Sequence, residues 1–275
     1  MPVFNAAHFI CDALNMVQAQ TINEWELVIV DDFSTDDTVN IIQDLMSKEK
    51  RILFSKNEKN WGPSYSRNKA ISMANGEWIA IVDADDFIEK ERLEKMIDWG
   101  EKYELDLVGD NQRWVDVENG NYMRSLFSNN FITPPFKTIN IKSYLNSVSK
   151  VQPKYTFGMV QPIIKLDFLK TNQITYQEDI RFGEDTVLHF DCLMKGAIFG
   201  VFEDEMYTCR KRNKKNATHS KHTASNQRMI NKHFWKSAID HKKYNLLPLV
   251  FKRMLAMFVR MIKQNMGDTL RPVQH

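Results

Sequence analysis

Hydrophobic and polar positions change between two periods along the first part of the chain, and this change predicts strands and helices in turn. Short apolar runs of strand length lie at residues 25–31, 52–55 and 78–82. Apolar residues at helical spacing occupy the segments 6–19, 39–45 and 63–75. Because covering helices join parallel strands, this order predicts an α/β fold with a mostly parallel central sheet flanked by helices.

Polar residues at the ends of the predicted helices are expected to cap them. Asn5 precedes the first helix, and Ser34 with Asp37 resembles a capping box at the start of the second. Pro63 suits the first turn of the third helix, which Asn75-Gly76 is expected to end.

The second half of the chain has a mixed pattern. A helix over residues 91–102 is followed by an expected hairpin, with strands at 113–117 and 122–126. Residues 129–135 are typical of a loop, and residues 186–194 suit a helix closed by Lys195-Gly196.

Composition excludes a disordered chain and shows a strong charge asymmetry. The 275 residues, 43% of them hydrophobic, can bury a full core. The formal net charge is +2, yet from Met206 onward 16 Lys and Arg accompany only two acidic residues. We therefore expect this basic segment to meet an anionic group: a diphosphate, a phospholipid surface, a nucleic acid or the acidic remainder of the chain.

Cysteine usage and hydropathy favour a cytoplasmic protein. Cys11, Cys192 and Cys209 form an odd set without metal-ligand spacing, as expected of reduced thiols. The sequence opens without the charged and then apolar segment of a secretory leader, and its apolar runs are shorter than a bilayer crossing.

Two predicted strands end in carboxylates. Asp83-Ala84-Asp85-Asp86 follows the strand at 78–82, and Asp31-Asp32 ends the strand at 25–31. In extended chain, residues i and i+2 point the same way, so Asp83 and Asp85 can face one divalent cation that holds a diphosphate. An acidic turn is the simple alternative, but strand ends of open α/β sheets share one binding crevice.

These motifs, taken in order, resemble those of the family 2 glycosyltransferases, which have the GT-A fold. The matching segments are Pro2-Val3-Phe4-Asn5, Val30-Asp31-Asp32, Asn60-Trp61-Gly62-Pro63 with Arg67-Asn68, Asp83-Ala84-Asp85-Asp86 and Phe182-Gly183-Glu184-Asp185. The resemblance implies inverting transfer of a hexosyl or N-acetylhexosaminyl group from a nucleotide sugar, usually a UDP-sugar, to a hydroxyl of a glycan or lipid-linked acceptor. Bacterial polysaccharide or lipopolysaccharide biosynthesis is the expected setting.

The resemblance also implies which residues bind the nucleotide. Pro2 and Phe4 belong to the first motif, where an aromatic ring commonly lies against the base, although Phe4 also suits an ordinary core. Asp32, with Asp31 beside it, is expected to accept from the uracil imide. Arg67 is expected to reach towards the nucleotide, and a solvated helix-face arginine is its alternative.

Metal binding and proton transfer are implied at the two later motifs. Asp85, with Asp83, is expected to hold Mn²⁺ or Mg²⁺, and Asp86 to support them. Asp185 is the expected general base, at a helix N-terminus that favours its ionised form. Helix capping is the alternative for Asp185.

The basic segment has two expected roles. Its cluster from Arg210 to Lys215, with His219, follows a position where the family often has a mobile segment near the diphosphate. Residues 250–262 suit an amphipathic helix with Lys252, Arg253, Arg260 and Lys263 on one face. Peripheral contact with the anionic inner membrane surface and packing on the catalytic domain both remain open; nucleic acid binding is not expected.

The expected organisation is a GT-A catalytic domain at 1–205 and a basic loop with a helical tail at 206–275. The nucleotide-sugar half covers about 1–110 and the acceptor half 111–205. Family members normally have an apolar strand before the Pro2-Val3-Phe4-Asn5 segment, so the first strand is expected to be missing here. A catalytically impaired nucleotide-binding protein and a membrane-surface adaptor acting through the tail are therefore alternative functions.

Overall fold

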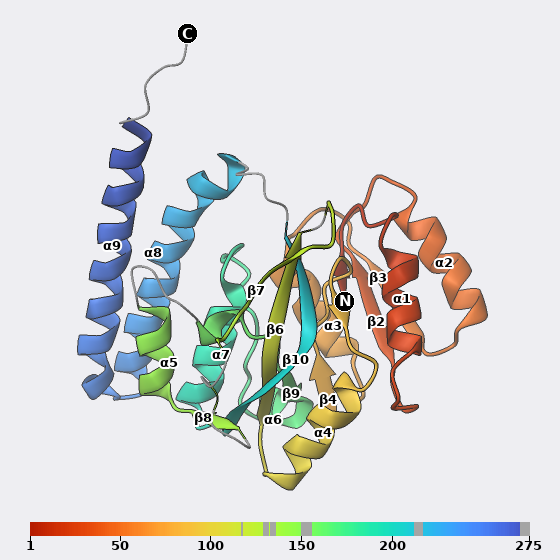
Figure 1. The fold of residues 1–275 in the computed structure, drawn as a ribbon, viewed down its shortest axis with the longest axis horizontal. Helices are drawn as coiled ribbons and strands as arrows, with labels where there is room; N and C mark the ends of the chain where they lie inside the picture. Colours follow the sequence, from red (N-terminus) through yellow and green to blue (C-terminus); the bar gives the residue numbers. More distant parts are fainter. Residues whose placement is uncertain (117, 129–131, 133–135, 150–155, 212–216, 270–275) are drawn as a thin grey trace.

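The computed structural model describes residues 1–116, 118–128, 132, 136–149, 156–211 and 217–269 (Figure 1). Its strands are β1 Pro2–Val3, β2 Leu27–Asp31, β3 Ile52–Lys56, β4 Trp78–Ala80, β5 Phe87–Ile88, β6 Leu107–Asp116, β7 Tyr122–Ser125, β8 Lys137–Ile139, β9 Ile163–Lys165 and β10 Phe199–Lys211. Its α-helices are α1 Ile10–Gln18, α2 Thr38–Lys48, α3 Pro63–Met73, α4 Arg92–Lys102, α5 Ile141–Val148, α6 Leu166–Thr171, α7 Glu184–Met194, α8 Ala217–Asp240 and α9 Leu247–Thr269. The α/β class is confirmed.

The N-terminal part of the chain contains a parallel sheet with the strand order β1-β2-β3. All five residues of β2 are buried, which explains why this strand is an unbroken apolar run ending in Asp31. β2 pairs in parallel with β3 from Leu27–Ile52 onward, and with β1 at Pro2–Val30. The carboxyl ends of β1 and β2 therefore lie side by side.

A second, mixed sheet fills the centre of the molecule, in the order β4-β9-β6-β10-β5. The strand expected at 78–82 belongs to this sheet, because β4 pairs antiparallel with β9 and not with the parallel strands. β6 and β10 are parallel, and the expected hairpin is present as the antiparallel pair β6–β7. β10 runs through residues 205 and 206, where the tail was expected to begin.

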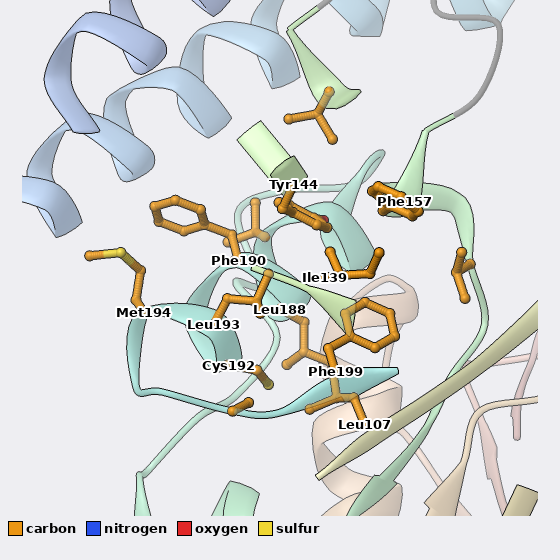
Figure 2. Packing of buried hydrophobic residues seen from close by; sticks show 14 of the residues in the cluster. Leu107, Ile139, Tyr144, Phe157, Leu188, Phe190, Cys192, Leu193, Met194 and Phe199 are labelled. Carbon is orange, nitrogen blue, oxygen red and sulfur yellow. The ribbon is translucent and has the colours of Figure 1, made fainter. Parts of the chain in front are cut away.

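The largest core lies around α7 (Figure 2). Leu188, Phe190 and Leu193 of this helix are buried beside Tyr144 of α5 and Phe199 of β10. The helix ends at Lys195-Gly196 as predicted, with Gly196 at φ 92°. Apolar packing on several sides thus fixes the helix that begins at Glu184-Asp185.

The tail helix α8 is part of this core. Its residues Ile230, Phe234 and Ala238 are fully buried, and the Phe234 ring stacks on Phe190 of α7 with 3.9 Å between centroids. α8 therefore packs on the rest of the molecule. Packing was left open for the helix at 250–262, which is part of α9, and Val250 of α9 is fully buried in the same core.

The basic residues expected on one face of α9 differ in exposure: Lys252 is exposed, whereas Arg253 is not. Arg253 is buried and donates to Asn231 and Gln227 of α8, while Phe251 and Phe258 are exposed. In Figure 1 this helix forms the outer edge of the molecule, with α8 and α5 on its inner side. The side chains of Arg260 and Lys263 lie outside the described residues.

The two caps expected near the N-terminus are wrong. α1 begins at Ile10, and Asn5 adopts φ 51° while its Oδ1 accepts from Thr35 N at 2.9 Å. Ser34 Oγ accepts from Asn5 N at 2.8 Å, and the Asp37 side chain makes no cap bond on α2. These polar side chains join the ends of β1 and β2 to each other, because the two strands end side by side.

The first strand is present but short. Within the described chain, β1 pairs with β2 at Pro2–Val30 and Val3–Asp31, and the buried Met1 amine donates to Val28 O at 2.7 Å. A cavity of about 620 Å³ lies between β2 and β4, with walls that include Met1, Val28 and Ile79. β1 is the edge strand of the parallel sheet, and β4 is the edge strand of the mixed sheet. A longer strand in this cavity that paired with both edges would join the two sheets.

We predict that four β-branched apolar residues added before Met1 stabilise the fold. In the register of β1, they would lie opposite residues 25–28 of the β2 strand and its lead-in. Each buried side chain contributes roughly 1.5–3 kcal/mol relative to its exposed state, so the urea midpoint should rise clearly. A Gly-Ser extension of equal length is the control, and equal midpoints for the two extensions would contradict the prediction.

The same variants should differ from the unextended chain in pH dependence. Burial lowers the pKa of the Met1 amine to about 5, from 8.0 in the unfolded chain. Between these values the unfolded state binds the extra proton, so stability of the unextended chain rises as pH rises from 5 to 8. Both extensions remove the buried amine, and urea titrations across this range should show that this rise is lost.

Candidate active site

A cavity of about 400 Å³ lies at the carboxyl ends of β1 and β2. Six of the residues predicted from sequence line it: Pro2, Phe4, Asp32, Arg67, Asp83 and Asp85. Asn60, Gly62, Arg181 and Glu184 are also in its wall. The structure therefore gathers motifs that lie up to 180 residues apart in sequence around one cavity, since Phe4 and Glu184 both line it.

Asp32 holds the loop that closes one side of the cavity. Its Oδ1 accepts from Trp61 N at 2.9 Å, and its Oδ2 accepts from Gly62 N at 2.7 Å. Gly62 adopts φ 95°, a conformation that favours glycine. Asn57 Nδ2 also donates to Asp32 Oδ1, at 2.9 Å.

Asp31 is placed differently from its neighbour. It is fully buried, its Oδ2 accepts from Ser34 N at 3.0 Å, and it is not in the described wall of the cavity. Successive side chains of a strand point to opposite sides, which explains why only one of the two carboxylates reaches the cavity. Its contacts are those of a turn-stabilising residue.

Arg67 connects the two acidic motifs across the cavity. Its Nη1 donates to Glu184 Oε1 at 2.6 Å and its Nη2 to Asp83 Oδ1 at 3.0 Å. Burial lowers the pKa of Arg67, but the nearby Asp185 and Asp83 outweigh burial and raise it well above its ordinary value. Removing one partner of such a buried pair costs about 3–5 kcal/mol, so this bridge fixes the motifs relative to each other.

The three carboxylates after β4 have different surroundings. Asp83 is about one-third exposed beside Arg67, and Asp85 is exposed at the cavity wall. Asp86 is buried and accepts from Tyr207 OH at 2.8 Å and from Arg210 N at 2.9 Å. Burial, followed by the charge of Asp83, raises the pKa of Asp86 to about 6. Asp86 therefore anchors the turn to β10 and leaves the other two carboxylates at the cavity.

The donor set at this turn fits a divalent cation that is shared with a phosphate. No cluster of three or more His, Cys, Asp or Glu side chains suited to a metal occurs within the described residues. Mg²⁺ sites commonly use one or two carboxylates and take their other ligands from water and substrate phosphate. Asp83 and Asp85 supply two carboxylates at the cavity wall, which meets that requirement.

Asp185 lies in the first turn of α7, next to the cavity-lining Glu184. Its Oδ1 accepts from Tyr176 OH at 3.1 Å, and the buried Tyr176 ring faces the Arg67 guanidinium at 5.4 Å. Burial, and then the charge of Asp185, raises the pKa of Tyr176, so its hydroxyl remains a donor. Burial and the adjacent Asp185 also raise the pKa of Glu184, against the opposite effect of Arg67.

Two residues at this site could not be predicted from the sequence pattern. Tyr176 and Arg181 each stand alone in polar segments, and only the folded chain brings them to Asp185 and Gly62. Of the expected basic cluster, Arg210 is described and its guanidinium donates to the Asp85 carbonyl. The side chains of Lys211 to His219 lie outside the described residues.

The chain is similar to proteins of glycan assembly. It is 28% identical to the succinoglycan biosynthesis protein ExoO of Rhizobium meliloti over 70% of this chain and 54% of that protein. It is 29% identical to the poly(ribitol-phosphate) beta-glucosyltransferase of Bacillus spizizenii, over 75% of this chain and 31% of that enzyme. The chain thus spans about half, or less, of the length of these two relatives.

Solved structures share the fold. A crystal structure of residues 1–349 of S. aureus TarS matches 99% of this chain and 74% of that one, with a TM-score of 0.71 and 21% identity. Its complex with UDP-GlcNAc matches 85% of this chain and 65% of that one, with a TM-score of 0.67 and 24% identity. These matches confirm the expected GT-A fold.

The motif order seen in the sequence has a counterpart in a family model. The model of glycosyl transferase family 2 matches residues 1–166, which is more than half of the chain and includes the Asp32 loop, Arg67 and the Asp83–Asp85 turn. On this evidence the chain belongs to glycosyl transferase family 2.

Proposed function

We propose that this protein transfers a hexosyl or N-acetylhexosaminyl group from a UDP-sugar to a hydroxyl of a glycan or lipid-linked acceptor, with inversion. The observation that carries the proposal is the Arg67 bridge, which holds the Asp83–Asp85 turn and the Glu184-Asp185 turn at one cavity. Family membership supports the reaction type, and the TarS complex with UDP-GlcNAc supports a UDP-sugar donor.

The donor would occupy the cavity with its base against Phe4. This ring is half exposed and lines the cavity together with Pro2, as a stacking surface requires. Asp32 is placed to accept from the uracil imide, although its oxygens already hold the loop at Trp61 and Gly62. Oδ1 already accepts from Trp61 N and Asn57 Nδ2, whereas Oδ2 accepts from Gly62 N, so the second lone pair of Oδ2 would take this additional contact.

The proton of the acceptor hydroxyl would pass to Asp185. Inversion requires one base on the side of the sugar opposite the leaving diphosphate. Asp185 is the carboxylate that follows Glu184 in the first turn of α7. The Tyr176 hydroxyl orients it through the 3.1 Å contact. Arg67 keeps a positive charge beside both acidic turns and so limits the repulsion among their carboxylates.

A divalent cation, Mn²⁺ or Mg²⁺, held by Asp83 and Asp85 would offset the negative charge of the leaving nucleoside diphosphate. Asp86 keeps the turn in place through Tyr207 and Arg210. Treatment with EDTA should therefore abolish transfer, and added Mn²⁺ or Mg²⁺ should restore it. In these roles the residues would provide the chemistry that the family resemblance implies.

We predict that Asp185→Asn and Asp85→Asn each abolish transfer without loss of folding. Loss of a general base costs about 10²- to 10⁴-fold in rate. UDP release with a panel of UDP-sugars measures the rate, and urea denaturation checks the fold. Asp12→Asn, an exposed change on α1, is the control.

One outcome would reject the enzyme, and another would reject only the assignment of Asp185 as the base. Tight UDP binding without transfer from any donor would favour the nucleotide-binding alternative. Undiminished transfer by Asp185→Asn would show that another group takes the proton.

We predict that Tyr176→Phe lowers kcat about tenfold or more and leaves the donor KM within about twofold, because the lost hydrogen bond orients a group used in the reaction step. Tyr144→Phe is the matched control: its hydroxyl is also buried against α7 and donates to Thr186 O at 2.8 Å. Steady-state kinetics on both variants give the two constants. Equal losses of kcat in the two variants would assign Tyr176 to folding alone.

Peripheral membrane contact is a second proposed property, favoured by the outer face of α9. Phe251, Leu255 and Phe258 are each more than half exposed and lie on one side of the helix. A basic segment with an exposed apolar face suits the surface of an anionic bilayer. None of the helices in the described ranges is long and apolar enough to cross a membrane.

We predict that Phe251→Ser with Phe258→Ser lowers binding to phosphatidylglycerol vesicles at least about fivefold, since two of the inserting rings are lost. Vesicle sedimentation across salt concentrations measures the binding. Tyr122→Ser, which changes an exposed aromatic residue on β7, should bind like the unaltered chain. Unchanged binding by the double variant would remove α9 as the contact.

A further inference from the structure

Arg181 stands at the rim of the donor cavity on a fixed segment of backbone. The preceding residue, Ile180, is buried, and its carbonyl accepts from Ser64 Oγ of α3 at 3.0 Å. Ile180 N also donates to Gln177 O at 3.1 Å. Ile180 thus ties the chain to α3, the helix that carries Arg67. Arg181 comes next, three residues before α7 begins. The Arg181 side chain starts from a defined position at the cavity.

The Arg181 guanidinium lies against Gly62. A Cβ built on Gly62 would be 3.5 Å from Arg181 Cζ and 3.6 Å from its Nη1. The same glycine donates its N–H to Asp32, so the guanidinium is beside the loop that Asp32 holds. These are ordinary van der Waals distances, so the guanidinium lies directly beside the backbone of Gly62.

The charge of Arg181 is available to a ligand. Glu184 and Asp83 engage Arg67, the other arginine in the wall of this cavity. Arg181 forms no ion pair or hydrogen bond with any residue that the structure describes, although several carboxylates line the same cavity. Its side chain is exposed, and it presents the planar fork of donors that matches phosphate oxygens.

We propose that Arg181 binds a phosphate oxyanion in this cavity. The inference rests on the proposed function and adds to it a residue that recognises the charged part of a substrate. The phosphate can come from two sources, the diphosphate of the donor or a phosphate group on the acceptor. Both present the same oxyanion to the guanidinium.

Binding measurements with three variants test the assignment. Arg181→Gln removes the charge and the fork, and Arg181→Lys keeps the charge but loses the fork. Lys59→Gln is the matched control, because it makes the same change of charge in the neighbouring loop, where Lys59 contacts the Trp61 ring and is not in the described cavity wall. Isothermal titration with uridine and with UDP, in Mn²⁺, separates the nucleoside contacts from the phosphate contacts.

If Arg181 contacts the donor diphosphate, Arg181→Gln weakens UDP binding about ten- to a hundredfold, the expected loss of a charge-assisted hydrogen bond. Uridine binding should change less than about twofold, since it lacks the phosphate contact. Arg181→Lys should lie between, and Lys59→Gln should match the unaltered chain. If the phosphate that Arg181 binds belongs to the acceptor, inorganic phosphate should bind the UDP-saturated unaltered chain. The UDP-saturated Arg181→Gln variant should not bind it.

The proposal is overturned if Arg181→Gln changes neither the ratio of UDP to uridine affinity nor the binding of inorganic phosphate. An equal effect of Lys59→Gln also overturns it, because net charge would then explain the result. If the unaltered chain binds neither uridine nor UDP, the proposed function itself fails. The uridine titration therefore distinguishes the two failures.

Discussion

The contact of Arg67 with Glu184 and Asp83 is the constraint on which the site depends. Asp83 follows β4, whereas Glu184 is the first residue of α7, and their charges would repel if nothing lay between them. A buried guanidinium with two acidic partners resolves this repulsion and sets their separation. Its position in turn requires α3 to start at Pro63, directly after the loop that Asp32 holds through Gly62.

Several parts of this arrangement follow from the sequence because they depend on local patterns. The run at Leu27–Asp31 is apolar because both faces of β2 are covered, and the acidic pair Asp31-Asp32 marks the end of this strand. The cavity therefore includes Asp32, Asp83 and Asp85, as expected. The division into domains stays a prediction, and β10 crosses its boundary.

Other parts could not be predicted, since they depend on contacts between distant segments. Asn5 and Ser34 are residue types that commonly cap helices. Here Asn5 N instead donates a hydrogen bond to Ser34 Oγ, 29 residues away in sequence, because β1 and β2 end side by side. The strand at 78–80 looks like any apolar run, and its antiparallel partner at 163–165 carries no signal of direction. α9 is apolar on two sides, so its period alone does not reveal that Arg253 faces α8.

The stacking of Phe234 on Phe190 has a consequence for the modularity of the chain. The ring from α8 completes the core that holds α7, and α7 begins with the proposed base. A chimaera that took its C-terminal helices from a relative would also need the residues of α7 on which they pack, such as Phe190. The C-terminal helix α8 and the turn that begins α7 therefore form one packed unit and cannot be replaced independently.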